Sequence, residues 1–495
     1  MANRVCALDL GTTSIKAAIF DESGRICGLA AAPVAPTAGE GILIDAEATC
    51  ASALALVRRA LESAGGAPGD IAALAVTNQR ASVVPVTADG APAGPGISWQ
   101  DTRCGADAAR FAEVFGAARY EALTGLPPSF LWTLGKLLLL RRADPAVWGG
   151  TARFALLHDF VLRAFGAGDL YCDLSNASLT GLLDLRALDW SDEILAAAGL
   201  DRARLPTLVR PGQRVGAVSR EAARRSGLRE GTWLVAGGGD QQCAALGQGA
   251  VEPGDAGLCL GTAAVVSCPV DAPLTGTGGR FFCTVHAAPG RWVIEGILNS
   301  FGSALDWAAR ALGLDGVAAL EAEASGASSE GAFFLPHLSG VGSPDHRAAA
   351  RGAWVGLDLG CTRARLARAA FEGVAHETGR ILDAMEERGP IRQLVLSGGG
   401  AAGQLLPRLL ADLSGRRLVL REHHEATLAG AALLAWCGAG RFADPLEAAR
   451  TLGRQGCARM VEPAGEPAER LAARARYLAW VRAFLAQADT NGGAP

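Results

Sequence analysis

Short apolar runs alternate with longer stretches of helical periodicity along most of the chain. The first two runs, Val5 to Leu10 and Ile15 to Phe20, are separated by a polar turn at residues 11–14 and predict a pair of strands. A helical pattern follows from Ala46 to Ser63, and a buried strand from Ile71 to Thr77. This alternation of strands and helices predicts an α/β protein.

A second unit of strand and helix follows later in the sequence. An apolar run at 233–236 leads through three glycines, 237–239, to Asp240, where we expect the N-cap of a helix. The turn sequence at 253–255 precedes the next strand, which places a domain boundary near Gln248. At roughly 150 residues per domain, a chain of this length holds two or three domains. We expect domains at 1–248 and 249–460, followed by a closing segment at 461–495.

The second half continues the same alternation. We expect strands at Ala256–Leu260, Trp292–Glu295 and Ile391–Leu396, and helices at Ser303–Leu312, Arg363–Glu386 and Glu469–Gln487. A linker at Pro463–Pro467 and a loose tail at Thr490–Pro495 would flank the closing helix.

The sequence Leu-Xaa-Leu-Gly-Thr occurs twice, at residues 8–12 and 258–262, and each copy ends an apolar run. Glycine lets the backbone approach an anion, and threonine hydroxyls can donate to phosphate oxygens, so two such strand ends suggest a phosphate clamp. Only the first copy carries an acid, Asp9, which could hold Mg²⁺. The alternative is that the repeat is a coincidence of two ordinary buried strands.

The first hairpin offers the fuller set of phosphate ligands. Its candidates for the β- and γ-phosphates and their metal ion are Asp9, Gly11, Thr12, Thr13 and Lys16. The alternative is a surface hairpin with a solvated lysine. The P-loop pattern Gly-x-x-x-x-Gly-Lys-Ser/Thr is absent from the sequence. The histidines at 376 and at 423–424 do not complete a His-Glu-x-x-His motif, so we expect no zinc site.

Two glycine-containing turns have further candidate roles. Asp240 follows three glycines at a strand end, where small residues would leave room for a ligand and a carboxylate could accept a proton from a hydroxyl. Its alternative role is simple helix capping. Residues 397–400 read Ser-Gly-Gly-Gly between a strand and a helix, and an adenine ring could lie close to such a backbone, although the segment could also be only a turn.

Planar hydrogen-bonding groups follow two other predicted strands. The segments Thr77–Arg80 and Ser98–Arg103 bring amide, guanidinium, carboxylate and indole groups together. This mixture suits a polyhydroxylated ligand, which offers hydroxyls on one side and C–H groups on another. The alternative is a surface salt bridge between Arg80 and Asp101.

The composition excludes several classes of partner. The formal net charge of −4 and the 19% of charged residues give no basic field for nucleic acid. The longest apolar stretch, Phe130 to Leu140, contains Lys136 and is too short for a bilayer. The 12 cysteines form no Cys-x-x-Cys pair, and nothing before the first strand could serve as a signal peptide. We expect a cytoplasmic protein with reduced thiols and with neither a nucleic-acid nor a membrane partner.

Taken in order, these motifs resemble the FGGY family of carbohydrate kinases. The resemblance runs from Asp9 to about Leu434 and rests on the segments Asp9–Lys16, Asn78–Arg80, Trp99–Arg103, Gly237–Gln242, Leu260–Thr262, Phe334–Gly340, Phe371–Gly373 and Ser397–Gly400. It implies a two-domain, ribonuclease H-like fold of the actin-type ATPases, with a cleft between the domains. It also implies transfer of phosphate from ATP, with Mg²⁺, to a small sugar.

The resemblance implies a role for each matched residue. Asp240 would be the general base, and Asp9 would hold the metal ion. The nucleotide would be bound by Gly11, Thr12, Thr13, Lys16, Gly261, Thr262, Gly398, Gly399, Gly400 and Ala401. The sugar would be bound by Gln79, Arg80, Ala81, Trp99, Asp240 and Gln241.

The substrate is harder to assign, because the chain combines motifs of two branches of the family. Residues 78–80 and 240–242 are similar to glycerol kinases, yet Ala81 and Val265 replace a hydroxyl-binding glutamate and a phenylalanine of that branch. Residues 258–263, 305–307 and 335–340 are similar to xylulokinases, whose Gln-Met-His-Gly segment is replaced here by residues 79–82. We expect a ketopentose such as xylulose, with glycerol or another polyol as the alternative.

Two other functional classes remain as alternatives. An actin-like ATPase would share the phosphate hairpins but would not need Asp240 together with Arg80 and Trp99. A sugar-sensing regulator would carry a basic DNA-binding segment at one end, whereas here the matched segment begins at Asp9. A homodimer is an expectation that comes from the family alone.

Overall fold

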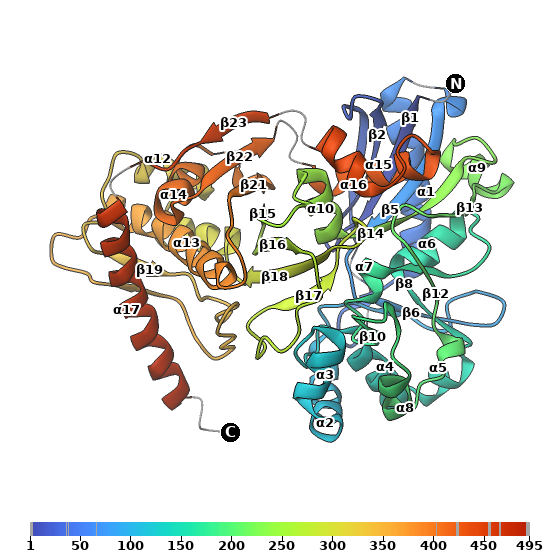
Figure 1. Ribbon diagram of the computed structural model, residues 1–495, viewed down its shortest axis with the longest axis horizontal. Coiled ribbons are helices and arrows are strands. Elements are labelled where there is room, and N and C mark those ends of the chain that lie inside the picture. The colour runs from blue at the N-terminus through green and yellow to red at the C-terminus, as the bar shows by residue number, and fades with distance from the viewer. Residues whose placement is uncertain are drawn as a thin grey trace.

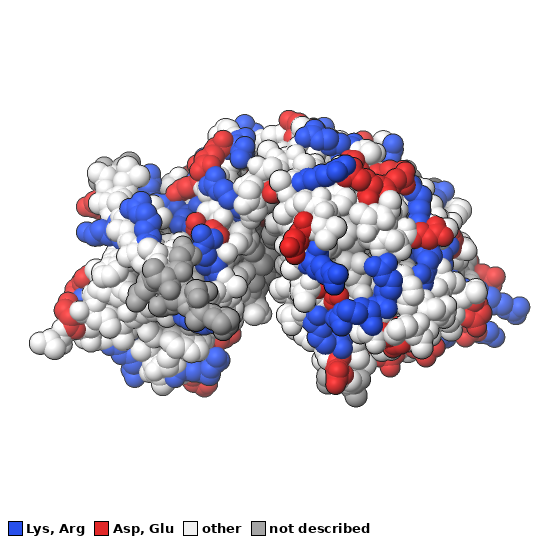
Figure 2. Space-filling model, turned by 90° about the horizontal axis from the view of Figure 1, so that it is seen from below, with Lys and Arg blue, Asp and Glu red and all other residues white. Residues whose placement is uncertain are grey.

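The computed structural model of the chain has two lobes, each built around one mixed β-sheet (Figure 1). It describes residues 3–35, 37, 39–65, 67–401, 403–421, 425–453, 457–464 and 467–491. Seen from below, the space-filling view has an indentation between the lobes, and basic and acidic side chains are mixed on the surface of the larger lobe (Figure 2).

The first sheet has six strands in the order β13-β14-β5-β1-β2-β3. Its strands are β1 (Arg4–Leu10), β2 (Ser14–Asp21), β3 (Ile26–Pro33), β5 (Ile71–Asn78), β13 (Arg214–Ala217) and β14 (Trp233–Gly239). β1 is antiparallel to β2 and parallel to β5, and β5 is parallel to β14. The carboxyl ends of β1, β5 and β14 therefore lie at one edge of the sheet, where their polar residues meet.

The second sheet has seven strands in the order β17-β18-β16-β15-β21-β22-β23. They are β15 (Asp255–Leu260), β16 (Ala264–Val270), β17 (Phe282–Val285), β18 (Trp292–Leu298), β21 (Gln393–Ser397), β22 (Arg417–Arg421) and β23 (Cys457–Val461). β15 is antiparallel to β16 and parallel to β21, which is parallel to β22. This repeats the pattern of β2-β1-β5-β14, so the repeated pentapeptide marks equivalent strands, β1 and β15, in the two lobes.

Shorter strands form small sheets beside the two large ones. They are β4 (Leu43–Ile44), β6 (Val83–Val86), β7 (Gly96–Ile97), β8 (Arg153–Leu156), β9 (Tyr171–Asp173), β10 (Leu183–Asp184), β11 (Asp189–Trp190), β12 (Thr207–Val209), β19 (Phe333–Leu335) and β20 (Ala353–Val355). β4, β6, β7 and β8 belong to one four-stranded sheet of the first lobe.

Helices cover the sheets and the insertions between strands. They are α1 (Ala46–Ala64), α2 (Gly105–Phe115), α3 (Ala117–Thr124), α4 (Thr133–Ala143), α5 (Pro145–Gly150), α6 (Leu157–Phe165), α7 (Leu174–Ala177), α8 (Asp192–Ala198), α9 (Arg220–Ser226), α10 (Asp240–Gln248), α11 (Gly302–Ala311), α12 (Gly316–Ala324), α13 (Arg363–Glu386), α14 (Leu405–Ser414), α15 (Ala426–Ala439), α16 (Pro445–Ala448) and α17 (Pro467–Asn491).

Local sequence explains the longest helix of the first lobe, α1. The carboxylate of Asp45 accepts a hydrogen bond from the N–H of Ala48 at the start of the helix, and Gly65 ends it in the left-handed conformation. Leu54, Val57 and Leu61 recur at helical spacing and are buried against the first sheet.

Helix α15 comes late in the sequence but packs on the first sheet. Leu428, Leu434 and Trp436 belong to one buried apolar cluster with residues of β1, β5 and β14. α15 also crosses α10, and Gly430 and Gly247 stand where the two helices meet; a Cβ at Gly430 would lie only 1.9 Å from the carbonyl oxygen of Cys243. Figure 1 shows α10 between the two sheets and α15 over the first sheet. The crossing therefore joins backbone to backbone at the junction of the lobes.

Most of the expected elements are present, with shifted ends. α13 has the expected bounds, Arg363–Glu386, and α11 is shifted by one residue from the expected helix. β14 continues through the three glycines, so Gly239 is the N-cap of α10 and the expectation that Asp240 caps it is wrong by one position. α17 extends to Asn491, which replaces the first two residues of the expected tail. The rest of that tail, and residues 465–466 of the expected linker, lie outside the described residues.

Candidate active site

The turn between β1 and β2 forms the first candidate phosphate site. Gly11 begins this turn, and a Cβ at that position would lie 2.7 Å from the carbonyl oxygen of Ser14. Only glycine lets the turn close this tightly. Thr12 is half-buried and Thr13 is exposed, so both are accessible to a ligand.

Asp9 lies one residue before the end of β1, opposite Lys16 of β2 and Thr77 of β5. Its Oδ1 is buried and has no hydrogen-bond partner among the described residues. Burial, and after it the negative charge of Asp240, raises the pKa of Asp9 to about 8. A buried carboxylate near a second carboxylate is stabilised by a divalent cation, and carboxylate oxygen is a ligand that Mg²⁺ prefers. The residues present therefore fit a magnesium ion.

Lys16 has a partner that the sequence did not predict. Its Nζ lies 2.7 Å from Oε1 and 2.9 Å from Oε2 of Glu425, the residue just before α15. Both side chains are about one-third exposed. The ammonium group thus lies at the edge of the phosphate hairpin with its charge shared by a carboxylate.

Three predicted site residues form a single chain of hydrogen bonds. The indole Nε1–H of Trp99 donates to Oγ1 of Thr12 at 3.0 Å, and Oγ1 of Thr12 donates to Oε1 of Gln79 at 3.2 Å. Trp99 and Gln79 were expected at the sugar, and Thr12 at the phosphates. The chain therefore joins the two expected subsites at the carboxyl ends of β1 and β5.

Arg80, at the end of β5, lies between two carboxylates. Its Nη1 and Nη2 donate to Glu295 of β18 at 2.9 and 2.6 Å, and its Nε lies 3.4 Å from Oδ1 of Asp240. The alternative pairing of Arg80 with Asp101 is wrong, because Asp101 is held by Arg103 and by the N–H of Ile42.

Glu295 was not among the functional residues predicted from the sequence. A signal was available, since it is the single charged residue of β18 in an otherwise apolar strand, Trp-Val-Ile-Glu-Gly-Ile-Leu. Its side chain is 1% exposed. Gln242 Nε2 and Thr284 Oγ1 also donate to its Oε1, at 3.0 and 2.6 Å.

Asp240 is the first residue of α10, and its side chain is one-third exposed. Its Oδ1 accepts the backbone N–H of Gln241 at 2.9 Å. Burial raises the pKa of Asp240, and the positive charge of Arg80 opposes the rise. Gln241 thus contacts Asp240 through its backbone, whereas the side chain of Gln242 turns to Glu295 and Thr284.

The glycines before Asp240 were expected to leave open space for a ligand. That expectation is wrong. A Cβ at Gly237 would lie 1.9 Å from the carbonyl oxygen of Val76, and one at Gly239 would lie 2.3 Å from Cδ of Arg80. Strand β5 and the arginine fill that space. The glycines instead let Arg80 lie directly against the strand end that carries Asp240.

A buried polar cluster supports this strand end from behind. Gly239 donates its N–H to Oγ of Ser175 at 2.9 Å, and Ser175 in turn donates to Asp173. His158 Nε2 lies 2.6 Å from Asp159 and 3.4 Å from Asp173. Although burial alone would lower it, the charges of these two aspartates raise the pKa of His158. This cluster could not be predicted from the sequence, because its residues are spread over three short elements.

The same cluster includes the sulfur of Cys172, which lies within 4.8 Å of the donor atoms of His158 and Asp159. Burial raises the pKa of the Cys172 thiol well above its ordinary value.

The second hairpin and the glycine turn meet at the end of β15. Gly261 and Thr262 are exposed between β15 and β16. Gly398 has a φ of 88°, and a Cβ there would lie 2.5 Å from the carbonyl oxygen of Leu260. The residues Gly399–Ala401 then form a 3₁₀ turn before α14 begins at Leu405. The expected phosphate and adenosine segments of the second lobe are therefore adjacent.

The side chain of Ala81 lies in an apolar cluster and not at an exposed surface of the site. It has a φ of 63°, is 1% exposed, and belongs to an apolar cluster with Trp132 and Val285. Its carbonyl oxygen accepts a hydrogen bond from Oγ1 of Thr133.

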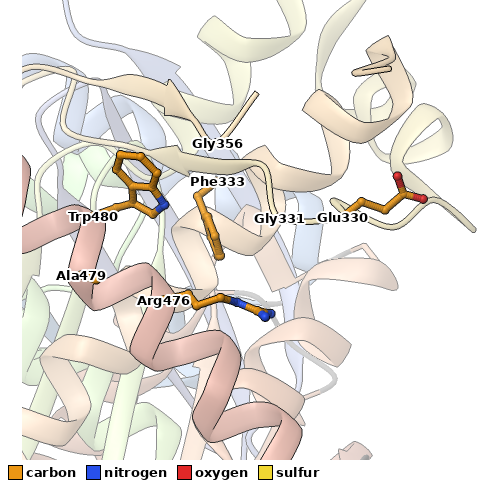
Figure 3. Close-up of a pocket in the computed structure, with 7 residues that line it drawn as sticks. All are labelled: Glu330, Gly331, Phe333, Gly356, Arg476, Ala479 and Trp480. Carbon is orange, nitrogen blue, oxygen red and sulfur yellow. The ribbon is translucent and has the colours of Figure 1, made fainter. Parts of the chain in front are cut away.

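A separate hollow of about 440 Å³ lies on the second lobe, between α17 and the strand β19. Figure 3 shows Trp480 and Arg476 of α17 on one side of it and Phe333 on the other. None of the predicted site residues lines this hollow.

Known proteins are similar to this chain over nearly its whole length. The model of the FGGY family of carbohydrate kinases, N-terminal domain, matches residues 4–247, and that of the C-terminal domain matches residues 257–439. Glycerol kinase of Bordetella parapertussis is 32% identical over 474 residues, which cover 90% of this chain and 92% of that protein. Xylulose kinase of Escherichia coli is 32% identical over 419 residues, 84% of this chain and 85% of that protein.

Solved structures agree with these matches. A protein described as a xyloylose kinase from Brucella ovis has 27% sequence identity and a TM-score of 0.88, with 98% of this chain and 99% of that chain covered. The fold is thus that of the two-domain kinases of the actin-type ATPase fold. The chain belongs to the FGGY family of carbohydrate kinases, and it is a phosphotransferase that uses ATP.

This membership confirms the fold and the enzyme class that the motifs predicted, and it removes the alternative of an ATPase without a sugar substrate. Within the described part of the chain, no helix has the length and apolar character needed to cross a bilayer.

Proposed function

We propose that this kinase transfers the γ-phosphoryl group of ATP to a hydroxyl of a ketopentose such as xylulose, with Asp240 as the general base. The observation that carries the proposal is the position of Asp240. Its carboxylate is partly exposed at the start of α10, is held by the N–H of Gln241, and lies beside the guanidinium of Arg80. A substrate hydroxyl that donates to Asp240 would also lie near the guanidinium of Arg80.

In this mechanism Asp240 accepts the proton of the attacking hydroxyl late in the transfer. Phosphoryl transfer has a loose transition state and depends mainly on positioning and charge neutralisation, so a weak base is sufficient. Arg80, Gln79 and Trp99 would orient the sugar, because they present donors and a flat apolar surface at the carboxyl end of β5.

The nucleotide would be bound by groups of both lobes. Gly11, Thr12, Thr13 and Lys16 of the first hairpin and Gly261 and Thr262 of the second would hold the phosphates. The turn from Gly398 to Ala401 would lie against the adenosine. Asp9 would hold Mg²⁺, which neutralises charge on the transferred phosphoryl group when it is bound. We also propose that residues 1–248 supply most of the sugar site and residues 249–460 the adenine site.

Two substrate classes receive support from different observations. A ketopentose is favoured by Val265, which is half-buried in β16 and leaves more room for a carbon chain than the phenylalanine of glycerol kinases. Ala81 gives no such support, because its side chain is buried in an apolar cluster. A polyol is favoured by the contact of Arg80 with Asp240, since a guanidinium binds vicinal hydroxyls. Relatives named glycerol kinase are 32 to 34% identical to this chain and xylulose kinase of Escherichia coli is 32% identical, so sequence identity does not separate the two classes.

The test is a coupled assay of ADP release with MgATP and a panel of ketopentoses, ketohexoses, glycerol and longer polyols. Asp240→Asn should lower kcat by about 10²- to 10⁴-fold, the usual contribution of a general base, and leave ATP binding nearly unchanged. The matched control is Asp45→Asn, the same change at the start of α1, where asparagine caps as well as aspartate.

The outcomes separate the parts of the proposal. A preference for D-xylulose or a related ketose, lost in Asp240→Asn but kept in Asp45→Asn, supports the whole proposal. A preference for glycerol would replace the substrate and keep the base. Wild-type turnover in a folded Asp240→Asn variant would refute the role of Asp240.

A further inference from the structure

Glu295 is an unusual residue for the middle of a strand. β18 lies between β16 and β17 in the second sheet, and its neighbours in sequence, Ile294 and Gly296, are apolar. A carboxylate buried in such a strand lowers stability unless it is paired and fully hydrogen-bonded. A residue of this kind therefore needs a specific partner.

Glu295 has four hydrogen bonds from three partners. Arg80 donates twice, at 2.9 and 2.6 Å, and Gln242 and Thr284 donate once each. Although burial alone would raise it, Arg80 and these hydrogen bonds hold the pKa of Glu295 below its ordinary value. The carboxylate is therefore ionised and satisfied at both oxygens.

The ion pair between Arg80 and Glu295 joins the two lobes at the candidate sugar site. Arg80 lies close to the end of β5 in the first sheet, and Glu295 lies in β18 of the second. Gln242 of α10 donates to the same carboxylate two residues after Asp240. The base, the arginine and the glutamate thus form one connected group that draws on both lobes.

Glu295 also competes with Asp240 for the same guanidinium. Arg80 is 2.6 to 2.9 Å from the oxygens of Glu295 but 3.4 Å from Asp240. The two Nη atoms face Glu295, and Nε faces Asp240, where it has no hydrogen bond of good geometry in the described part of the chain. The bidentate pair with Glu295 therefore keeps Arg80 from closing fully onto Asp240.

We propose that Glu295 is a positioning residue for the sugar, which holds Arg80 so that Asp240 and a substrate hydroxyl can share its remaining donors. The proposal rests on the proposed function, in which Asp240 and Arg80 contact the sugar. Without Glu295, Arg80 has one carboxylate left and closes onto Asp240, which removes both groups from the sugar. Glu295 acts on the substrate only through Arg80.

The first test compares Glu295→Gln with the wild type, by initial rates with D-xylulose and with glycerol. We expect the KM of the preferred sugar to rise about tenfold or more, the effect of losing one charge-assisted hydrogen bond, while the KM of ATP stays within about twofold. The matched control is Glu377→Gln, which breaks another buried pair of the second lobe, with Arg380, away from Arg80 and Asp240. If Glu295 had only a structural role, Glu295→Gln would resemble Glu377→Gln. It would change the KM of the sugar and the KM of ATP alike, or would lower only the thermal stability.

The second test places Glu295→Gln in an Arg80→Met background. Arg80→Met alone raises the KM of the sugar, and adding Glu295→Gln should change it by no more than about twofold, because the residue through which Glu295 acts is already absent. If Glu295→Gln alone does not fold, the double variant Arg80→Met/Glu295→Met, which removes both buried charges together, takes its place in the comparison with Arg80→Met.

An unchanged sugar KM in Glu295→Gln, or an additive rise in the double variant, overturns the proposal. Failure of the proposed function looks different. In that case the wild type releases no ADP in response to any sugar of the panel, or Asp240→Asn keeps full activity, before any change at Glu295 is made.

Discussion

Replacing Gly430 by alanine adds one methyl group at the point where α15 crosses α10. The new Cβ would lie 1.9 Å from the carbonyl oxygen of Cys243 and 2.6 Å from its carbonyl carbon. Both atoms belong to the backbone of α10, so no side chain can turn away to make room. The facing residue, Gly247, is in similarly tight contact with α15, since a Cβ at Gly247 would lie 2.1 Å from the carbonyl oxygen of Ala426.

The size of the effect follows from these distances. A carbon atom needs about 3.4 Å from a carbonyl oxygen, so the helices must separate by about 1.5 Å. Overpacking of a buried contact lowers stability by about 1 to 3 kcal/mol, and a clash with backbone lies at the upper end, at about 3 kcal/mol. Asp240 is the first residue of α10, and a displacement of about 1 Å at a reacting group lowers the rate by about 10²-fold.

The assay combines heat inactivation with steady-state kinetics on Gly430→Ala. We expect inactivation at a lower temperature and, at temperatures where the variant is folded, a kcat lowered by about 10²-fold. The control is Gly149→Ala in α5, where nothing lies within 4 Å of the new Cβ. That change should leave activity unchanged and stability equal or slightly higher, because alanine is the better helix residue.

Unchanged stability and kcat in Gly430→Ala would refute the view that α10 and α15 form a fixed crossing. A loss of stability alone, with normal kcat in the folded enzyme, would show that the crossing does not position Asp240.

Three further predictions concern charge. His286 is buried, its Nδ1 accepts the N–H of Ala288, and burial lowers its pKa to about 4 from an ordinary 6.5. The contribution of this neutral ring to the free energy of unfolding is fully present above pH 6.5 and is lost as the pH falls towards 4, by about 3 kcal/mol in all. Denaturant titrations at several pH values measure this loss, and a free energy of unfolding that does not change between pH 6.5 and 4 would contradict the prediction. Lys16→Met should raise the KM of ATP about tenfold and leave that of the sugar alone, and equal changes in both would exclude a role at the phosphates. Because the pKa of Asp240 is raised, kcat/KM should fall at acid pH with an apparent pKa above 3.8. An apparent pKa below 3.8 would argue against Asp240 as the base.

The strands that carry the site could be predicted from the sequence with good accuracy. The two copies of the pentapeptide mark equivalent strands in the two sheets. They could be recognised because the Gly-Thr pair follows each apolar run directly in the sequence. Gly11 and Gly398 are likewise explained locally, since a tight turn and a close backbone contact each require glycine.

The contacts between distant segments could not be predicted in this way. The partner of Arg80 is Glu295, 215 positions away, and that of Lys16 is Glu425, 409 positions away. The periodicity of apolar residues indicates only which face of a helix or strand is buried. It does not indicate which distant segment packs against that face. The expectation that glycines 237–239 leave room for a ligand was wrong for the same reason, because the space is filled by β5 and Arg80.

The packing of α15 on the first sheet has a consequence for folding during synthesis. The strands β1, β5 and β14 are complete once Gly239 has been made, but the helix that covers their second face begins only at Ala426. Until then an apolar surface that includes Val5, Ala75 and Val235 lacks the apolar residues of α15 that complete its cluster. The ribosome must therefore produce almost the entire second lobe before the first can close its core, and the nascent first lobe is a surface on which chaperones can bind and aggregation can begin.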